Sequence, residues 1–157
     1  MYLTKPEPNP PRLPAGPMAQ AARVADAATA DRMSPGTYVR LRRHKAGWSI
    51  PDLARAVAAT PDDRQPLQDE FRAIEQSSSG IHRRRVAQMA ELLDLDMAIY
   101  LALVGFAQNP SPDLPSPRIC TGCGCTWDHA CADKDGLCDF PDDKTDLCTA
   151  CTHTEKD

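Results

Sequence analysis

Residues 37–57, TYVRLRRHKAGWSIPDLARAV, decide the fold class of this 157-residue chain. Ser49 is followed closely by Pro51, an order typical of a helix start at which a serine side chain caps the first backbone N–H groups. The apolar residues of this segment repeat at the helical spacing i, i+3, i+4 and i+7, and they are Ile50, Leu53, Ala54 and Val57. A shorter basic helix is predicted over residues 38–45, ending near Gly47. The segment therefore predicts two consecutive helices.

The helical periodicity continues to residue 104. Residues 60–63, Thr-Pro-Asp-Asp, predict another helix start, which Pro66 should interrupt. Three later apolar stripes are Leu67, Phe71 and Ile74, then Val86, Met89, Ala90 and Leu93, then Met97, Tyr100, Leu101 and Val104. Residues 77–80, SSSG, predict a turn between the first two of these helices. The sequence thus predicts a mainly α fold, with five helices around one small core.

Residues 36–105 resemble the helix-turn-helix domain of the lambda-repressor/Cro family. The matching stretches are TYVRLRRHKAG and WSIPDLARAV, followed by FRAIE and RRRVAQMAELLDLD. The second helix of that family carries a Leu-Ala pair, here Leu53 and Ala54. Its third helix, the recognition helix, ends in Ile-Glu, here Ile74 and Glu75. The resemblance implies a five-helix helix-turn-helix bundle that binds double-stranded DNA.

Basic and polar side chains in this segment suit a DNA contact, since arginine and lysine bind phosphate and arginine and glutamine bind base edges. The candidate DNA-binding residues are Arg40, Arg43, Lys45, Gln68, Arg72, Arg83, Arg84 and Arg85. Two features depart from the family. The stretch 54–74 is several residues longer than usual, and Asp69 and Glu70 make the third helix acidic. The alternative to DNA binding is that these arginines pair with Asp and Glu on a solvated face. The helix-turn-helix fold would then serve protein contact.

Seven cysteines lie between residues 120 and 151. The Cys120-x-x-Cys123 and Cys148-x-x-Cys151 knuckles can bring four thiolates to one tetrahedral ion, the geometry that structural zinc prefers. The further candidate ligands are Cys125, Cys131, Cys138 and His129. This set is sufficient for one or two zinc ions per chain. An iron–sulfur cluster is the second choice, because thiolates bind both.

Disulfide bonds are the alternative to a metal. The N-terminal stretch MYLTKPEPNPPRLPAGPMAQ has no apolar run that would fit a signal peptide, and no segment approaches the roughly 20 apolar residues of a membrane span. These features predict a cytoplasmic protein without a membrane partner. In a reducing compartment clustered cysteines more often bind metal. An odd number of cysteines also argues against complete pairing.

The cysteine segment, ICTGCGCTWDHAC…LCDF…DLCTAC, is similar to a small cysteine-rich module found in phage and prophage-associated proteins. The match covers all seven cysteines and departs at Phe140, where that module commonly has an aromatic pair or a tryptophan. We expect Trp127 and Phe140 to form a small hydrophobic core, which a metal must supplement at this size.

Composition divides the chain into four parts. Residues 1–33 predict a disordered proline-rich arm with a possible alanine-rich helix, 34–107 the helix-turn-helix domain, 108–117 a proline-rich linker and 118–157 the cysteine-rich zinc module. Residues 34–106 carry ten basic and nine acidic residues, whereas 117–157 carry four and nine. The acidic module is a poor ligand for nucleic acid. The linker should let the two domains fold separately.

The sequence as a whole predicts a small intracellular DNA-binding transcriptional regulator of a bacterial or phage type. Its structural zinc module would serve assembly, as in a homodimer, or contact with a protein partner. No catalytic residues are expected, because the chain has neither a phosphate-binding glycine loop nor paired catalytic carboxylates. The alternative is an adaptor that binds protein, for example the transcription machinery. A redox or metal sensor is the third hypothesis, favoured by the surplus cysteines.

Overall fold

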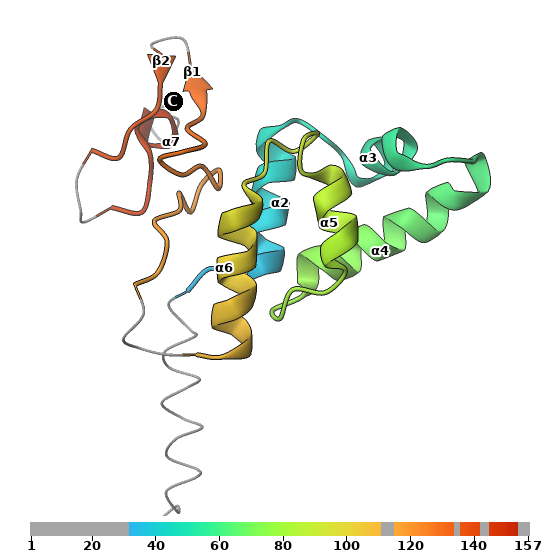
Figure 1. Cartoon of the computed structure of the whole chain (residues 1–157). Coiled ribbons are helices and arrows are strands. Elements are labelled where there is room, and N and C mark those ends of the chain that lie inside the picture. The colour runs from blue at the N-terminus through green and yellow to red at the C-terminus, as the bar shows by residue number, and fades with distance from the viewer. Residues whose placement is uncertain (1–31, 111–114, 134–135, 142–144, 154–157) are drawn as a thin grey trace, which may run out of the picture.

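The computed structural model describes residues 32–110, 115–133, 136–141 and 145–153 (Figure 1). Most of this part of the chain before residue 110 is helical, which confirms the predicted mainly α fold. The predicted proline-rich arm and nearly all of the alanine-rich helix fall outside the described residues. The C-terminal part carries a cluster of cysteines and little regular structure.

The first two described helices begin at serine caps. Helix α2 (Pro35–Lys45) starts after Ser34, whose Oγ accepts the Thr37 N–H at 3.1 Å. Helix α3 (Ile50–Val57) starts after Ser49, whose Oγ accepts the Asp52 N–H at 3.2 Å, so the sequence placed this helix start correctly. Gly47, with φ of +76°, makes the turn between them.

Pro66 does not interrupt the next helix, contrary to the sequence prediction. A 3-10 turn, η1 (Pro61–Asp63), leads directly into α4 (Arg64–Gln76). Thr60 and Asp63 cap each other at its start, with the Thr60 N–H 2.9 Å from the Asp63 carboxylate. Pro66 is the third residue of α4, where a backbone N–H has no partner within the helix, and its ring costs little there.

Two more helices complete the bundle. Helix α5 (Arg83–Met89) is shorter than predicted, and Leu93 lies in the turn that follows it, yet is fully buried. Helix α6 (Met97–Gln108) is capped by Asp96, whose carboxylate accepts the Ala98 N–H at 2.8 Å. Leu101 was expected on its buried face but is 45% exposed. That face is formed by Tyr100, Leu103 and Val104.

The core joins all of these helices to the start of the cysteine segment. Its largest fully buried apolar side chains are Tyr38, Tyr100, Phe71, Leu53, Ile74, Met89 and Leu93. Ile119, which directly precedes the first cysteine, belongs to the same cluster. Gly36 lets α2 approach the end of α4, since a Cβ there would lie 2.6 Å from the carbonyl oxygens of Ile74 and Ser77.

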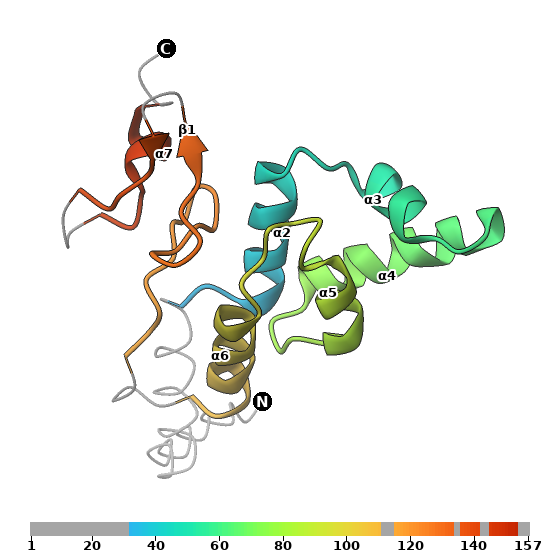
Figure 2. The ribbon, with the colours of Figure 1, turned by 45° about the horizontal axis from the view of Figure 1, so that its top comes forward.

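The cysteine module, residues 119–153, lies against α2 and away from α3 and α4 (Figures 1 and 2). Strands β1 (Ala132–Asp133) and β2 (Gly136–Leu137) form a short antiparallel ribbon, with Ala132 opposite Leu137. Helix α7 (Thr149–His153) carries the last cysteine. In both views α2 lies between this module and the α3–α4 pair.

Candidate metal centre and basic surface

Seven free thiols converge in the cysteine module. Six of them are buried, and Cys151 is half-buried. Among the described residues, two sets of four sulfurs lie within 4.8 Å of one another. One set is Cys120, Cys123, Cys148 and Cys151, the predicted double Cys-x-x-Cys frame, and the other is Cys123, Cys125, Cys131 and Cys148. The predicted cysteine cluster is therefore present, and either set could bind a metal ion.

Sulfur separations fit a tetrahedral ion. A Zn–S bond of about 2.3 Å implies S···S edges of about 3.8 Å in a regular tetrahedron. The Sγ of Cys123 lies 3.8 Å from that of Cys148 and 3.9 Å from that of Cys131. The Cys131 and Cys148 sulfurs are 3.8 Å apart. One face of a zinc-sized tetrahedron is thus already formed.

Backbone geometry holds these sulfurs in place. The Cys148 N–H donates to the Cys120 Sγ at 3.3 Å, and the Cys131 N–H donates to the Cys138 Sγ at 3.2 Å. Such bonds stabilise thiolate charge. Gly122 lies within the first knuckle, where a Cβ would be 3.0 Å from the Cys151 Sγ. A side chain at this position would therefore require the Cys151 sulfur to shift.

Because the thiols lie close together, each changes the pKa of its neighbours. Hydrogen bonds from Cys123 and Cys125 lower the pKa of Cys120, and the same contacts with Cys120 raise the pKa of Cys123 and of Cys125. Burial raises the pKa of Cys138 to about 11 and that of Cys151 to about 12. A thiolate at Cys120 thus keeps its neighbours protonated. Ionising all of them requires a cation in their midst.

His129 does not join either sulfur set. Its Nδ1 lies 3.3 Å from an Asp96 carboxylate oxygen, without the alignment of a hydrogen bond. The predicted ligand is therefore directed toward the helical part of the chain. Asp96 is itself the cap of α6, so His129 links the cysteine module to that helix start.

The sequence predicted that Trp127 and Phe140 together form the core of the module, but Trp127 is not part of it. Phe140 is buried, whereas Trp127 is 62% exposed and touches it only with one side, at a ring-centroid distance of 5.8 Å. The buried thiols fill the interior instead. Arg118 covers the Phe140 ring at 4.6 Å, which adds a cation–π contact.

The module packs on α2 through Gly124, between Cys123 and Cys125. This glycine has φ of +74°, and a Cβ there would lie 3.1 Å from the Arg42 Cδ and 3.2 Å from the Leu41 Cβ. Arg42 is buried and donates to the carbonyl oxygen and carboxylate of Asp94. Sequence reasoning missed this contact, although the Cys-Gly-Cys spacing was a signal for a close approach.

The predicted DNA-binding residues divide into two groups. Arg40 and Lys45 are exposed on α2, but Arg43 is buried, and its guanidinium binds Glu75 at the end of α4 at 2.5 and 2.9 Å. Burial raises the pKa of Cys131, but hydrogen bonds with Cys138 and Cys148, and after them the positive charge of Lys45, lower it below its usual value. Because its guanidinium is bound by Glu75, Arg43 is unavailable to phosphate.

The remaining candidates lie on α4 (Gln68 and Arg72) and in the first turn of α5 (Arg83, Arg84 and Arg85). We use the name basic surface for the charged and polar side chains of these two segments, which are Arg64, Gln68, Asp69, Glu70, Arg72, Arg83, Arg84 and Arg85. The Asp69 carboxylate binds Arg72 at 2.8 Å. The Glu70 carboxylate binds Arg85 and His82, each at 3.0 Å. The Gln68 side-chain oxygen accepts from Arg72 at 3.3 Å.

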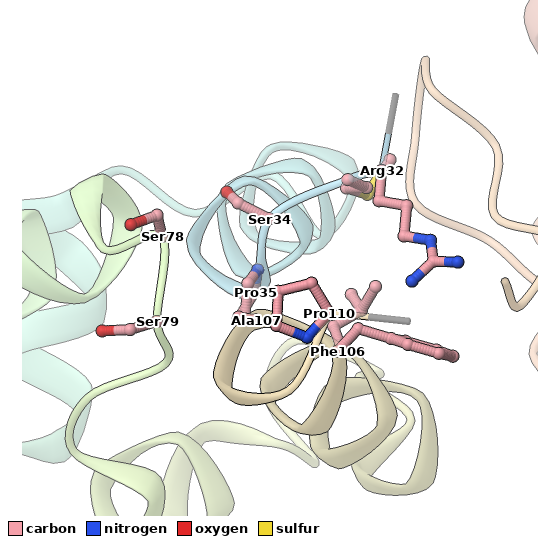
Figure 3. Close-up of a pocket in the computed structure, with 10 residues that line it drawn as sticks. Arg32, Ser34, Pro35, Ser78, Ser79, Phe106, Ala107 and Pro110 are labelled. Atoms are coloured by element: carbon pink, nitrogen blue, oxygen red, sulfur yellow. The ribbon is translucent and has the colours of Figure 1, made fainter. Parts of the chain in front are cut away.

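A shallow pocket of about 290 Å³ lies at the N-terminal end of α2, between α6 and the 77–80 turn (Figure 3). Its lining includes Ser78, Ser79 and Ala107, and Arg32 lies over the Phe106 ring at 4.5 Å. The figure shows no convergence of polar side chains on a common point. The pocket therefore offers no chemistry of its own.

Comparison with known proteins identifies no relative, since no family model, curated protein or solved structure matches the chain. Within the described residues, no helix is long and apolar enough to cross a membrane.

Proposed function

We propose that the protein is a DNA-binding transcriptional regulator of the bacterial or phage type, acting in the cytoplasm. Its cysteine module binds zinc as a closed structural site. The observation that carries the DNA-binding proposal is the charge pairing on the basic surface. There the Asp69 carboxylate is bound by Arg72 of α4, and the Glu70 carboxylate is bound by Arg85 of α5.

This pairing removes the main obstacle to DNA. Free carboxylates on α4 would repel phosphate, but Asp69 is engaged by Arg72 and Glu70 by Arg85. Arg64, Arg83 and Arg84 are exposed and form no ion pair with a carboxylate among the described residues. The surface therefore keeps an excess of positive charge that suits the phosphate backbone.

The buried Arg43–Glu75 pair supports the same proposal in another way. It joins α2 to the last turn of α4, and Arg43 also donates to the Trp48 carbonyl at 2.8 Å. This arrangement fixes α4 on the bundle with its outer face free. Arg43 is thus a positioning residue rather than a DNA contact.

Zinc with a structural role is favoured by the donor set. Both sets of four contain sulfur alone, and a fourfold sulfur site leaves no coordination position for a substrate. A catalytic zinc site keeps such a position open beside a general base. We therefore propose no enzymatic activity for this module.

Salt dependence of DNA binding tests the proposal. Fluorescence anisotropy with a labelled duplex should show steep weakening between about 50 and 200 mM salt. Arg83→Ala with Arg84→Ala should reduce the log–log salt slope by about 2 units, because each phosphate contact contributes roughly 0.9. These two substitutions leave the Glu70–Arg85 pair intact.

Arg40→Ala with Lys45→Ala provides the matched control. It removes the same charge from α2 and should leave the salt slope unchanged. A slope that falls only in this control would move the DNA contact to α2. Wild-type protein without affinity at low salt would exclude DNA binding.

An adaptor that binds protein is the second candidate, favoured by exposed apolar side chains on the cysteine module. Trp127 is 62% and Leu137 76% exposed. Large aromatic side chains of this kind are frequent binding determinants in protein interfaces. If the wild-type protein binds no DNA, Trp127→Ala is the variant to test for loss of a co-purifying protein partner.

A further inference from the structure

We propose that the cysteine module binds two divalent cations in a single cluster, with the Cys123 and Cys148 thiolates bridging both ions. Cys120 and Cys151 complete the coordination of one ion, and Cys125 completes that of the other together with Cys131. This inference rests on the proposed zinc binding and specifies its stoichiometry and ligand assignment.

The two sulfur sets overlap, which supports a shared cluster. Each contains four cysteines, and both contain Cys123 and Cys148. Two separate four-sulfur sites would need eight ligands, and the chain has seven cysteines. His129 would have to supply the eighth, but it lies beside Asp96 and belongs to neither set. Two ions placed in these two sets therefore share the thiolates of Cys123 and Cys148.

Distances along the shared edge support bridging. The Sγ atoms of Cys123 and Cys148 are 3.8 Å apart, which matches the edge of a zinc–sulfur tetrahedron. Two tetrahedra can share such an edge, with one ion on each side of it. Cys131 lies 3.9 and 3.8 Å from the two bridging sulfurs, so it occupies a vertex of the second tetrahedron.

Charge balance also supports a second ion. One ion bound by four thiolates and two ions bound by six thiolates each leave two net negative charges in the largely buried site, so the second ion is bound without an increase in buried charge. Buried charge of that size is costly unless paired.

Cys138 is the seventh thiol and lies outside both sets. Its Sγ accepts the Cys131 N–H at 3.2 Å and lies 3.5 Å from the Cys125 Sγ. The proposal therefore assigns it to the surroundings of the second ion, where it contacts two ligands without binding the metal. This assignment makes Cys138 the natural internal control.

Native mass spectrometry of the full chain, purified anaerobically and titrated with zinc, measures the stoichiometry. We expect two zinc ions per chain. One ion per chain would overturn the shared cluster while the proposed zinc binding stands, and no bound metal would overturn both.

Cadmium-113 NMR of the wild-type protein tests the bridging directly and needs no substitution. Two cadmium resonances that are scalar-coupled to each other are expected, because the coupling passes through a shared sulfur. Two uncoupled resonances would mean separate sites and would contradict the proposal.

Single substitutions then assign the ligands. Cys151→Ser and Cys131→Ser should each lose one of the two ions, from opposite sides of the shared edge. Cys138→Ser should retain both ions. Loss of an ion from the Cys138→Ser variant, with the helical circular dichroism unchanged, would show that Cys138 is a ligand and that the assignment is wrong.

Discussion

At the residue scale, the ion pair between Arg43 and Glu75 is buried on both sides. Both side chains are 8% exposed, so removing one leaves an uncompensated buried charge. We expect Arg43→Ala to lower the free energy of unfolding by about 3–5 kcal/mol. Urea unfolding followed by circular dichroism measures it.

Arg40→Ala is the control for that variant, since it removes the same charge three residues earlier on the exposed side of α2. It should change stability by less than about 0.5 kcal/mol. Equal effects of the two substitutions would contradict the burial of Arg43.

Ionisation of the buried Tyr38 hydroxyl should lower the free energy of unfolding at alkaline pH. Burial raises the pKa of this hydroxyl to about 12, from 10.0, despite the hydrogen bond that it accepts from the Asp96 N–H. Because the raised pKa favours the neutral form in the folded state, its contribution is complete below pH 10 and is lost as the pH approaches 12. The full shift corresponds to roughly 2–3 kcal/mol.

Tyr38→Phe isolates this contribution from the titration of other groups. The variant loses the hydroxyl that accepts the Asp96 N–H, so it should be less stable than wild type at pH 9. Its unfolding free energy should then fall less steeply between pH 10 and 12. A stability difference that stays constant over this range would refute the assignment.

Residue patterns alone predicted which side chains are basic but not which are buried. Arg40, Arg42 and Arg43 are alike in sequence, yet only Arg40 is exposed. The burial of the other two depends on acceptors 32 and 52 residues away, Glu75 and Asp94. Local composition carries no information about such distant partners.

At the element scale, we expect substitution of two helical glycines by alanine to change stability in opposite directions. Gly36→Ala would place a Cβ 2.6 Å from two carbonyl oxygens at the end of α4, so α2 and α4 must separate. We expect a loss of about 1–3 kcal/mol from this crowding. Gly105→Ala in α6 meets nothing within 4 Å and should stabilise the protein by about 0.5–1 kcal/mol.

Thermal unfolding of both glycine variants checks this pair. A Gly36→Ala protein as stable as wild type would show that α2 and α4 are not in close contact.

Under the proposed DNA binding, we expect α4 to be the element that recognises bases. Gln68 and Arg72 are its outward donors suited to base edges, and Arg72 is held by Asp69 and Gln68. Gln68→Ala with Arg72→Ala should reduce the preference for a selected sequence over random DNA by about 1–3 kcal/mol per recognised base. Competition binding measures the preference. An unchanged preference would exclude α4 as the base-reading element.

Helix starts were predictable because their signals are local. Ser49 caps α3, and Thr60 with Asp63 caps the turn before α4, as the sequence indicates. The errors have other causes. Pro66 was tolerated because it falls in a first turn, and Leu93 is buried by the turn after α5 rather than by a longer helix. Tertiary packing decides the burial of Leu93, whereas the tolerance of Pro66 follows from its position in the helix.

At the scale of the whole molecule, the cysteine module is joined to the helical bundle. Ile119 lies in the helical core, Gly124 packs on Arg42, and His129 faces Asp96. The proline-rich composition of the preceding linker suggested independent folding units, since it contains little to bury. Contacts made beyond the linker were not visible in that composition. The cysteine spacing, by contrast, predicted the sulfur cluster correctly, because both Cys-x-x-Cys knuckles are local.

We expect metal binding in the cysteine module to stabilise the helices on which this module packs, because Ile119 and Gly124 contact the helical part of the chain. Structural zinc typically contributes about 10–16 kcal/mol of apparent binding free energy, and binding to the folded state alone raises stability. The most direct measurement is thermal unfolding of the zinc-loaded protein, followed by helical circular dichroism before and after chelation. We predict that chelation lowers the melting temperature of the helices themselves. Helices that melt at the same temperature with and without zinc would contradict this account.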